Sequence, residues 1–300
     1  MTPETDNNNT DKILHGMAYA LLSIFLLSVM SACAKTLSET HHVVETVFYR
    51  NAIALIPFLT YILVFKKYEY LKTNRPFRVM LRVLVGTTGL FVTFAAWKHL
   101  PLADATVIFF TSTLLAPALA FFILKEHIGP HRWSAILIGF TGILFIAHPS
   151  GEADLLGIAF AFCAALLHSC IHIILRSLKT ESHMMVTFYF ILGGALIPAL
   201  AMPFIATPVH SEEIPIFLLL GLTGGAAQIL LAGAYRYAPV SVVAPFHYTG
   251  LIWASGFDIL IWKTVPGWSV FVGAAIIITA NLYILHRERK KITGSASPAP

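Results

Sequence analysis

The fold is decided by residues 16–57, which read GMAYALLSIFLLSVMSACAKTLSETHHVVETVFYRNAIALIP. The same pattern returns 141 places later, without a gap, at residues 157–198, which read GIAFAFCAALLHSCIHIILRSLKTESHMMVTFYFILGGALIP. The two stretches share small, polar and proline positions as well as apolar ones, and both close on Ala-Leu-Ile-Pro. A repeat of this length predicts one structural unit that is present twice in the chain.

The composition indicates that a lipid bilayer surrounds most of the chain. Of the 300 residues, 57% are hydrophobic and 12% are charged, and the mean hydropathy is +0.76. In a soluble domain about a quarter of the residues are charged. A helix that crosses a bilayer needs about 20 apolar residues. Ten such runs lie near residues 15–37, 43–65, 77–97, 103–124, 133–148, 155–176, 184–204, 214–234, 240–262 and 267–286. We therefore predict an all-α membrane protein with ten transmembrane helices.

The two copies are expected to be inverted relative to each other. Each copy holds five predicted helices, and an odd number makes the second copy enter the membrane from the opposite face. For the later helices the offset becomes 138 residues, which pairs Gly86 with Gly224 and Thr111 with Thr249. Inverted repeats have two states, open to either side of the membrane, around a central site. The predicted organisation is a disordered cytoplasmic tail (1–12), a first repeat (13–148), a second repeat (149–290) and a second disordered cytoplasmic tail (291–300).

Basic residues predict the topology. With the N-terminus inside, the cytoplasmic ends and loops hold fourteen Lys and Arg, and the opposite side holds Lys35, Lys98 and Lys263. This bias predicts that both termini are cytoplasmic. We attribute the net charge of +5 to the basic residues that set the membrane topology, so no nucleic-acid partner is expected. The expected partners are the lipid bilayer and a small-molecule substrate, and the chain is expected to be a monomer or a weak homodimer in the inner membrane.

The cysteines favour neither a disulfide framework nor a metal centre. Cys33, Cys163 and Cys170 lie inside apolar runs and form no CxxC pair. They are interpreted as small core residues. We expect no metal and no cofactor.

Candidate site residues come from positions at which the two copies differ. An ionisable group in hydrocarbon costs at least about 2.5–3.5 kcal/mol, so packing alone does not require a charge where the other copy is apolar. The pairs that differ are Arg50 and Ile191, Arg82 and Leu220, Asp258 and Ala120, Gln228 and Leu90, His168 and Leu27, and His172 and Ser31.

The candidates divide into two expected roles. The residues predicted to bind substrate are Arg50, Arg82, Gln228, His247, Tyr248 and Trp253. An arginine cannot lose its charge and can hold a carboxylate bidentately, whereas aromatic rings can stack on a flat or cationic ligand. The residues predicted to couple transport to protons are Asp258, Glu45, His168 and His172.

A structural alternative stands beside several of these roles. Arg50 could form an internal ion pair with Glu45 or Asp258, and Asp258 could pair with Lys263 or Arg50. Arg82 lies near the cytoplasmic edge and could extend its charge to the interface. The two histidines, spaced i, i+4, could form a hydrogen-bonded core pair in place of a proton relay.

Several motifs resemble those of the EamA-type carriers of the drug/metabolite transporter superfamily. They are FYR (48–50), LPLADA (100–105), FTSTLLAP (110–117), the L-x-E of Leu124 and Glu126 followed by Trp133, Gly139 and Gly142, YAP (237–239) and APFHY (244–248). The resemblance covers roughly residues 13–286. It implies ten helices in two inverted repeats around a central cavity, and substrates such as amino acids, S-adenosylmethionine, riboflavin, metallophores or drugs. The second copy lacks the acid of the L-x-E motif near Thr264, and Asp258 is the candidate to replace it.

The predicted function is secondary active transport of a small polar metabolite by alternating access. The metabolite is expected to be amino-acid- or nucleoside-derived, as S-adenosylmethionine and riboflavin are among the family's substrates. The alternatives are a drug or amino-acid exporter of the same fold, an intramembrane enzyme, or a channel. The sequence lacks a Walker-type phosphate loop and the motif sets of intramembrane enzymes, so we expect no enzymatic activity. It also lacks a filter-like sequence.

Overall fold

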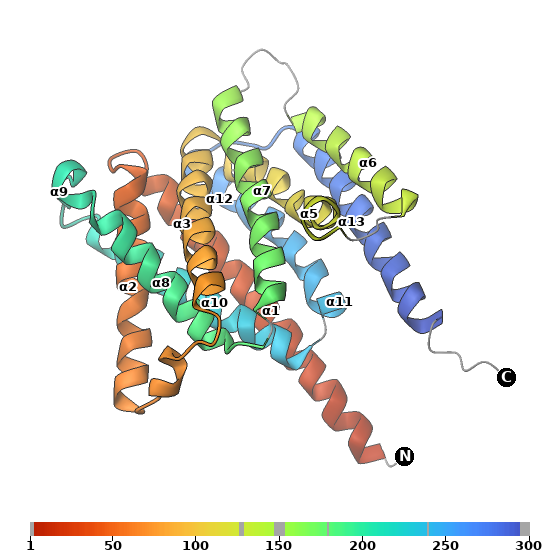
Figure 1. Ribbon diagram of the computed structural model, residues 1–300. Coiled ribbons are helices and arrows are strands. Elements are labelled where there is room, and N and C mark those ends of the chain that lie inside the picture. Colours follow the sequence, from red (N-terminus) through yellow and green to blue (C-terminus); the bar gives the residue numbers. More distant parts are fainter. Residues whose placement is uncertain (1–2, 126–128, 147–153, 179, 239, 295–300) are drawn as a thin grey trace.

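A computed structural model describes residues 3–125, 129–146, 154–178, 180–238 and 240–294 (Figure 1). All regular elements in these ranges are helices. Their bounds are α1 (Pro3–Leu37), α2 (Val43–Val64), η1 (Tyr68–Leu71), α3 (Pro76–His99), α4 (Leu102–Phe110), α5 (Ser112–Leu124), α6 (Pro130–Ile146), α7 (Leu155–Ser177), α8 (His183–Ala199), α9 (Met202–Ile205), α10 (Ile214–Tyr237), α11 (Val240–Val243), η2 (Ala244–Thr249), α12 (Gly250–Trp262) and α13 (Trp268–Gly294).

The helices are long and apolar enough for a multi-pass membrane protein. Within the described residues, seven continuous segments of 18 residues or more have the length and hydropathy of membrane spans, and the segments 133–145 and 183–199 are shorter apolar helices. Large apolar side chains cover the outer surface, and α6 for example exposes Leu137 and Leu144 by 65% and 69%. A surface of this kind is unfavourable in water and matches the hydrocarbon of a bilayer.

Some element bounds differ from the sequence-based expectation. The first helix begins at Pro3, so it extends into the segment expected as a disordered tail, and α13 continues to Gly294. The helix expected at 184–204 ends at Ala199 and is followed by the short α9. Glu126 of the L-x-E motif and residues 149–153, at the start of the predicted second repeat, lie outside the described residues.

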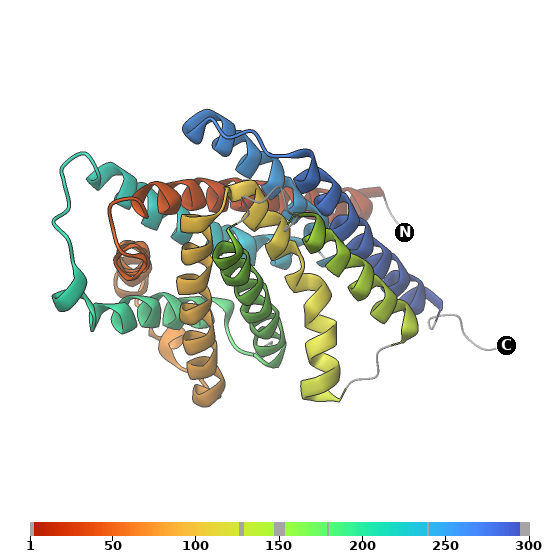
Figure 2. The same ribbon diagram turned by 90° about the horizontal axis from the view of Figure 1, so that it is seen from above.

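The helix packing follows the two copies. By the sequence offsets, α1 corresponds to α7 and α3 corresponds to α10. The largest contacts join α1 to α10 and α3 to α7, so equivalent helix pairs form across the two copies. The helices α2 and α8 are equivalents and pack on each other, and α6 packs in the same way along its equivalent α13 (Figures 1 and 2). The largest helix contacts therefore join one copy to the other.

One helix is broken at the same position in each copy. The first copy turns at Thr111 between α4 and α5, and the second passes through η2 to Thr249, the equivalent residue, before α12. Each threonine hydroxyl donates a hydrogen bond of 2.6 Å to the carbonyl oxygen three residues earlier. Such a bond offers the backbone an alternative to continuing the helix. Both segments also end on an equivalent lysine in the left-handed conformation, Lys125 (φ 53°) and Lys263 (φ 58°).

The two breaks lie against each other. Phe110 and Tyr248 occupy equivalent positions immediately before them, and their rings contact edge to face with centroids 5.1 Å apart. Asn281 of α13 ties the first break down, because its side-chain amide donates to the carbonyl oxygen of Phe110 at 3.3 Å and its carbonyl accepts from Thr113 at 2.5 Å. The two interrupted helices therefore contact each other at their breaks.

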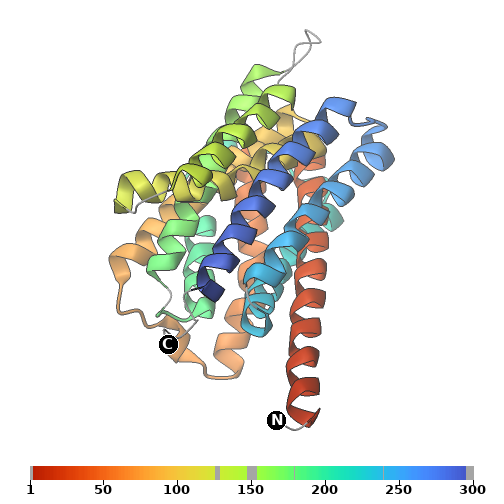
Figure 3. The same cartoon turned by 90° about the vertical axis from the view of Figure 1, so that its right-hand side faces the viewer.

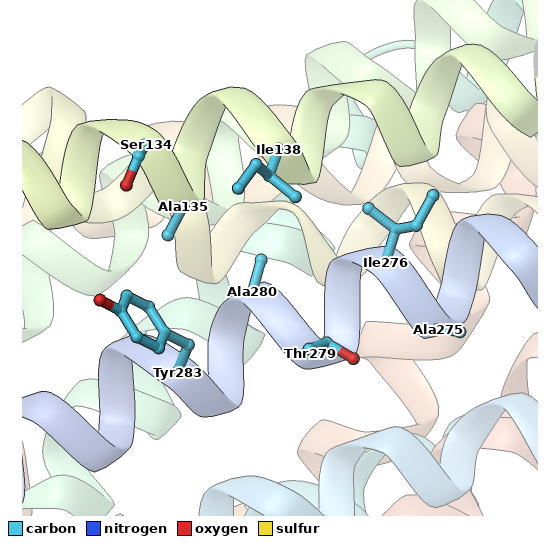
Figure 4. A pocket seen from close by; sticks show the side chains of 8 residues that line it. All are labelled: Ser134, Ala135, Ile138, Ala275, Ile276, Thr279, Ala280 and Tyr283. Atoms are coloured by element: carbon cyan, nitrogen blue, oxygen red, sulfur yellow. The ribbon is translucent and has the colours of Figure 1, made fainter.

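A groove of about 570 Å³ runs along the outer surface between α6 and α13 (Figure 4). Its lining is formed by Ser134, Ala135, Ile138, Ala275, Ile276, Thr279, Ala280 and Tyr283. None of these is a predicted site residue. The groove belongs to the apolar outer face of the helix pair, where Ile138 is 54% exposed.

The close approach of α6 and α13 yields a stability prediction. A Cβ atom at Gly142 would lie 2.8 Å from the carbonyl oxygen of Gly273 and 2.7 Å from Ile277. Because part of this contact is backbone, Gly142→Ala is expected to destabilise the protein by about 1–3 kcal/mol, measured by thermal unfolding in detergent. Gly256→Ala is the matched control, since nothing lies within 4 Å of its Cβ position. Equal melting temperatures for the two variants would contradict the packing described here.

Candidate functional site

Two arginines of the candidate site are buried side chains. Arg50 of α2 is 1% exposed and Arg82 of α3 is 8% exposed. Both guanidinium groups lie over the ring of Phe190 on α8, with Cζ 5.8 Å and 4.1 Å from its centroid. A guanidinium over an aromatic face is attracted by the ring quadrupole. Phe190 was missed by the sequence comparison because its equivalent, Tyr49, is also aromatic.

The alternatives foreseen for these arginines are not realised in the described residues. Arg50 donates to the side-chain carbonyl of Asn51 at 2.7 Å and to the backbone carbonyl of Gly224 at 3.3 Å. It forms no ion pair with Glu45 or Asp258. The side chain of Arg82 does not extend to the surface of the protein either, because it is buried and its guanidinium lies over the ring of Phe190.

The histidines lie beside the arginines. His168 and His172 of α7 interact electrostatically with Arg82, and His247 of η2 interacts with His172. His168 lies 3.4 Å from the hydroxyl of Thr93. The structure therefore brings five predicted site residues into one basic cluster, which we define as Arg50, Arg82, His168, His172 and His247.

A pair of equivalent contacts differs between the copies beside this cluster. In the first copy Trp97 stacks edge to face on Phe109, with centroids 6.2 Å apart. The equivalent residues of the second copy are Tyr235 and His247, whose hydroxyl and Nε2 lie 3.2 Å apart. The second copy thus carries a polar pair where the first carries an apolar one, which makes the site chemically asymmetric.

The remaining predicted substrate residues lie at different distances from the cluster. Tyr248 contacts Phe110 at the helix breaks. Gln228 is half-buried on α10, one turn beyond Gly224. Trp253 packs edge to face on Phe25 of α1, with centroids 4.9 Å apart, and is 39% exposed. Its role in binding stays a prediction.

Asp258 holds the first residues of α4. It has no exposed surface, and its two oxygens accept hydrogen bonds from the backbone N–H groups of Leu102 at 3.0 Å and Ala103 at 2.8 Å. Its ion-pair partner is Lys35, whose Nζ lies 3.5 Å away, and not Lys263 or Arg50 as the sequence had suggested. A carboxylate at a helix N-terminus satisfies N–H groups that have no partner within the helix.

Glu45 belongs to a polar cluster at the N-terminal ends of α2 and α10. Its oxygens accept from the backbone N–H of Thr207 at 3.1 Å and from the hydroxyl of Thr207 at 2.9 Å. The two ring nitrogens of His41 lie 2.7 Å from Glu45 and 3.0 Å from Glu213. Glu213 in addition accepts from the hydroxyl of Thr40 at 2.8 Å. These five residues, which we call the inter-repeat link, join the turn before α2 to the segment before α10.

The inter-repeat link is expected to depend on pH. Burial disfavours charge on His41, but its hydrogen bonds to Glu213 and Glu45 outweigh burial and raise the pKa of His41 above its ordinary 6.5. The backbone N–H of His210, then His41 and Thr40, donate to Glu213 and lower the pKa of Glu213 to about 2. His210 also faces Glu213, with Nδ1 3.4 Å away.

The sign of the effect follows from these shifts. A raised histidine pKa contributes stability that is complete below 6.5 and is lost as pH rises through the raised value. The lowered pKa of Glu213 contributes stability that is complete above 4.5 and is lost as pH falls towards 2. The melting temperature of the wild type should therefore exceed that of His41→Gln by more at about pH 5.5 than at about pH 8.5. A difference that does not change with pH would contradict this.

Long apolar helices in two matching units, with two buried arginines beside a group of histidines, define a multi-pass membrane protein of the transporter class. The model of the EamA-like transporter family matches residues 14–148 and 154–285. The chain belongs to this family.

The relatives agree with this family, and a solved structure shares the fold. The chain is 30% identical to the S-adenosylmethionine uptake transporter of Rickettsia prowazekii, covering 96% of this chain and 98% of the relative. It is 27% identical to the pseudopaline exporter CntI of Pseudomonas aeruginosa strain UCBPP-PA14, covering 93% and 99%. A solved crystal structure matches with a TM-score of 0.63 and 17% identity over 94% of this chain and 98% of the other, which shows the same fold.

Proposed function

We propose that the protein is a secondary active transporter that moves a small polar metabolite across the inner membrane by alternating access. The observation that carries this proposal is the contact of two broken helices at equivalent positions, Phe110 against Tyr248, beside a buried basic cluster. Discontinuous helices at the interface of two repeats form the substrate sites of many secondary transporters. Rocking one repeat against the other around this contact would expose the cluster to either side.

The proposed topology has ten crossings and inverted repeats. The seven long spans, the two shorter apolar helices and the interrupted segment 240–262 together supply ten crossings. The N-terminal end of α1 and the C-terminal end of α13 lie at the same end of the molecule (Figure 3), as an even number of crossings requires. With the excess of basic residues, this supports two cytoplasmic termini. Accessibility labelling should find residues 149–154 and the C-terminal tail on opposite sides of the membrane.

The proposed substrate is amino-acid- or nucleoside-derived. A relative named for S-adenosylmethionine uptake and another named for pseudopaline export support a polar metabolite. We propose that Arg50, Arg82, His247, Tyr248 and Gln228 line its site.

Counterflow in proteoliposomes tests the proposal. Vesicles that contain the purified protein and unlabelled S-adenosylmethionine should accumulate labelled S-adenosylmethionine transiently and with saturation. A carrier exchanges its substrate in this way, a channel does not, and an enzyme would alter the solute. Methionine, riboflavin and adenosine are tested in the same format as further substrates. Flux that never saturates, or no exchange with any of these solutes, would contradict the proposal.

Proton coupling is part of the proposal and has its own test. The candidates are Asp258, Glu45, His168 and His172. The histidines lie in the basic cluster, whereas the carboxylates lie in polar contacts at helix ends. Transport that is indifferent to a collapsed proton gradient in sealed vesicles would remove all four from this role.

A further inference from the structure

The buried arginines have more hydrogen-bond donors than partners. A guanidinium group has five N–H donors and no acceptor. The Nε of Arg50 and both Nε and Nη1 of Arg82 are buried without a hydrogen-bond partner. Among the described residues, neither arginine has a carboxylate within ion-pair distance. A buried charge without a partner costs several kcal/mol, so these unfilled donors point to a partner from outside the chain.

The scaffold makes room for both guanidinium groups at equivalent positions. A Cβ atom at Gly224 would lie 2.8 Å from the Nε of Arg50, and a Cβ atom at Gly86 would collide with the Nη1 of Arg82. Gly86 and Gly224 are equivalents in the two copies. The arginines themselves are not duplicated, because the equivalents of Arg50 and Arg82 are Ile191 and Leu220. Both copies have a glycine at this position, whereas the two arginines occur in the first copy alone.

The acidic residues that lie nearest to the repeat interface are already engaged. Asp258 holds the start of α4 and pairs with Lys35. Glu45 holds Thr207 and His41. The side chains beside Arg82 are histidines, which add positive charge when they are protonated. The two arginines therefore carry positive charge that no carboxylate in the described part of the chain balances within ion-pair distance.

We propose that Arg50 and Arg82 bind the carboxylate of the transported substrate. A carboxylate accepts two parallel N–H bonds from one guanidinium, through Nε and Nη2 or through Nη1 and Nη2, so it can fill one of the two unpartnered donors of Arg82. The guanidinium of Arg50 lies over the same Phe190 ring and adds a second positive charge. This deepens the proposed transport function and rests on it. The class of substrate that follows is a metabolite with a free amino-acid carboxylate, whatever its other end carries.

Binding measurements with matched probes test the carboxylate. The probes are S-adenosylmethionine and its decarboxylated analogue, and methionine and methioninol, which differ in the carboxylate. In thermal-shift titrations of the purified protein, the carboxylate probes should bind wild type about 10- to 100-fold more tightly than their partners, as expected for charge-assisted hydrogen bonds. Equal binding of the members of each pair, or stabilisation by inorganic phosphate or adenosine monophosphate alone, overturns the proposal.

Variants of Arg82 separate recognition from structure. Arg82→Gln should lose the preference for the carboxylate and, without ligand, should melt no lower than wild type because an unpaired buried charge is removed. Arg82→Lys keeps the charge without the planar fork and should retain a weakened preference. Arg78→Gln is the control, since Arg78 is exposed on the same helix and donates to the carbonyl oxygen of Ser177 at 3.1 Å. An unchanged preference in Arg82→Gln overturns the proposal.

The two proposals fail in distinguishable ways. Counterflow that accepts S-adenosylmethionine and its decarboxylated analogue equally would leave transport standing and overturn the carboxylate site. Carboxylate-dependent stabilisation that requires Arg82, without counterflow of any probe, would leave the carboxylate site standing and overturn transport. The absence of stabilisation of wild type by either carboxylate probe counts against the site.

Discussion

Asp258→Ala is expected to lower the free energy of unfolding by about 3–5 kcal/mol, the cost of breaking a buried ion pair. The carboxylate has no exposed surface and accepts the N–H groups of Leu102 and Ala103. Its removal leaves these two donors and the ammonium of Lys35 without their acceptor. Thermal unfolding in detergent and the yield of monodisperse protein measure the loss, which should be large enough to reduce the folded fraction at growth temperature.

Two variants control this experiment. Asp258→Asn keeps the shape and one acceptor oxygen, so its loss should be smaller. Lys35→Met removes the 3.5 Å ion pair but leaves both hydrogen bonds to α4 in place. It should cost less than Asp258→Ala, although the ammonium also donates to the carbonyl oxygen of Leu100 at 2.9 Å. If Lys35→Met is as destabilising as Asp258→Ala, the ion pair dominates and the capping account is wrong.

The division of the chain into two units could be predicted from its own repetition. The offsets of 141 and 138 residues anticipate the family match to residues 14–148 and 154–285. They also pair Thr111 with Thr249, which the structure shows as two equivalent breaks. The break at Thr111 could not be predicted, because neither of its immediate neighbours is a glycine or a proline. A threonine inside an apolar run gives only a weak signal.

Comparison of the two copies identified most of the charged candidate residues. It did not identify the residues that these candidates contact. Arg50 and Arg82 stand out because their equivalents are apolar, and the structure places both over Phe190. The partners of Asp258 and Glu45 depend on how helices distant in sequence cross, which periodicity does not contain. Lys35 and Asp258 are separated by almost the whole of both repeats. His41 was not among the predicted site residues, because a histidine at a helix start gives no signal of a partner such as Glu213.

Glu45→Ala is expected to destabilise the protein by about 3 kcal/mol and to loosen the segment before α10. The side chain has no exposed surface, so its loss leaves the backbone N–H of Thr207 without its acceptor. The hydroxyl of Thr207 and the Nδ1 of His41 lose their bonds to the carboxylate and keep only each other, 2.8 Å apart. Each unsatisfied buried group costs about 1–3 kcal/mol. Thermal unfolding measures the first effect. Hydrogen exchange measures the second, which should be faster across residues 206–213 than in wild type.

Glu45→Gln distinguishes the carboxylate from its shape. The amide oxygen can still accept the N–H of Thr207, so exchange at residues 206–213 should rise less than in Glu45→Ala. The charge that favours protonated His41 is lost, so the pH dependence of the inter-repeat link should become weaker. If alternating access requires this link to open, both variants should also favour the state in which α2 and α10 separate at these ends. Unchanged exchange at 206–213 in Glu45→Ala would mean that Glu45 does not hold the two repeats together.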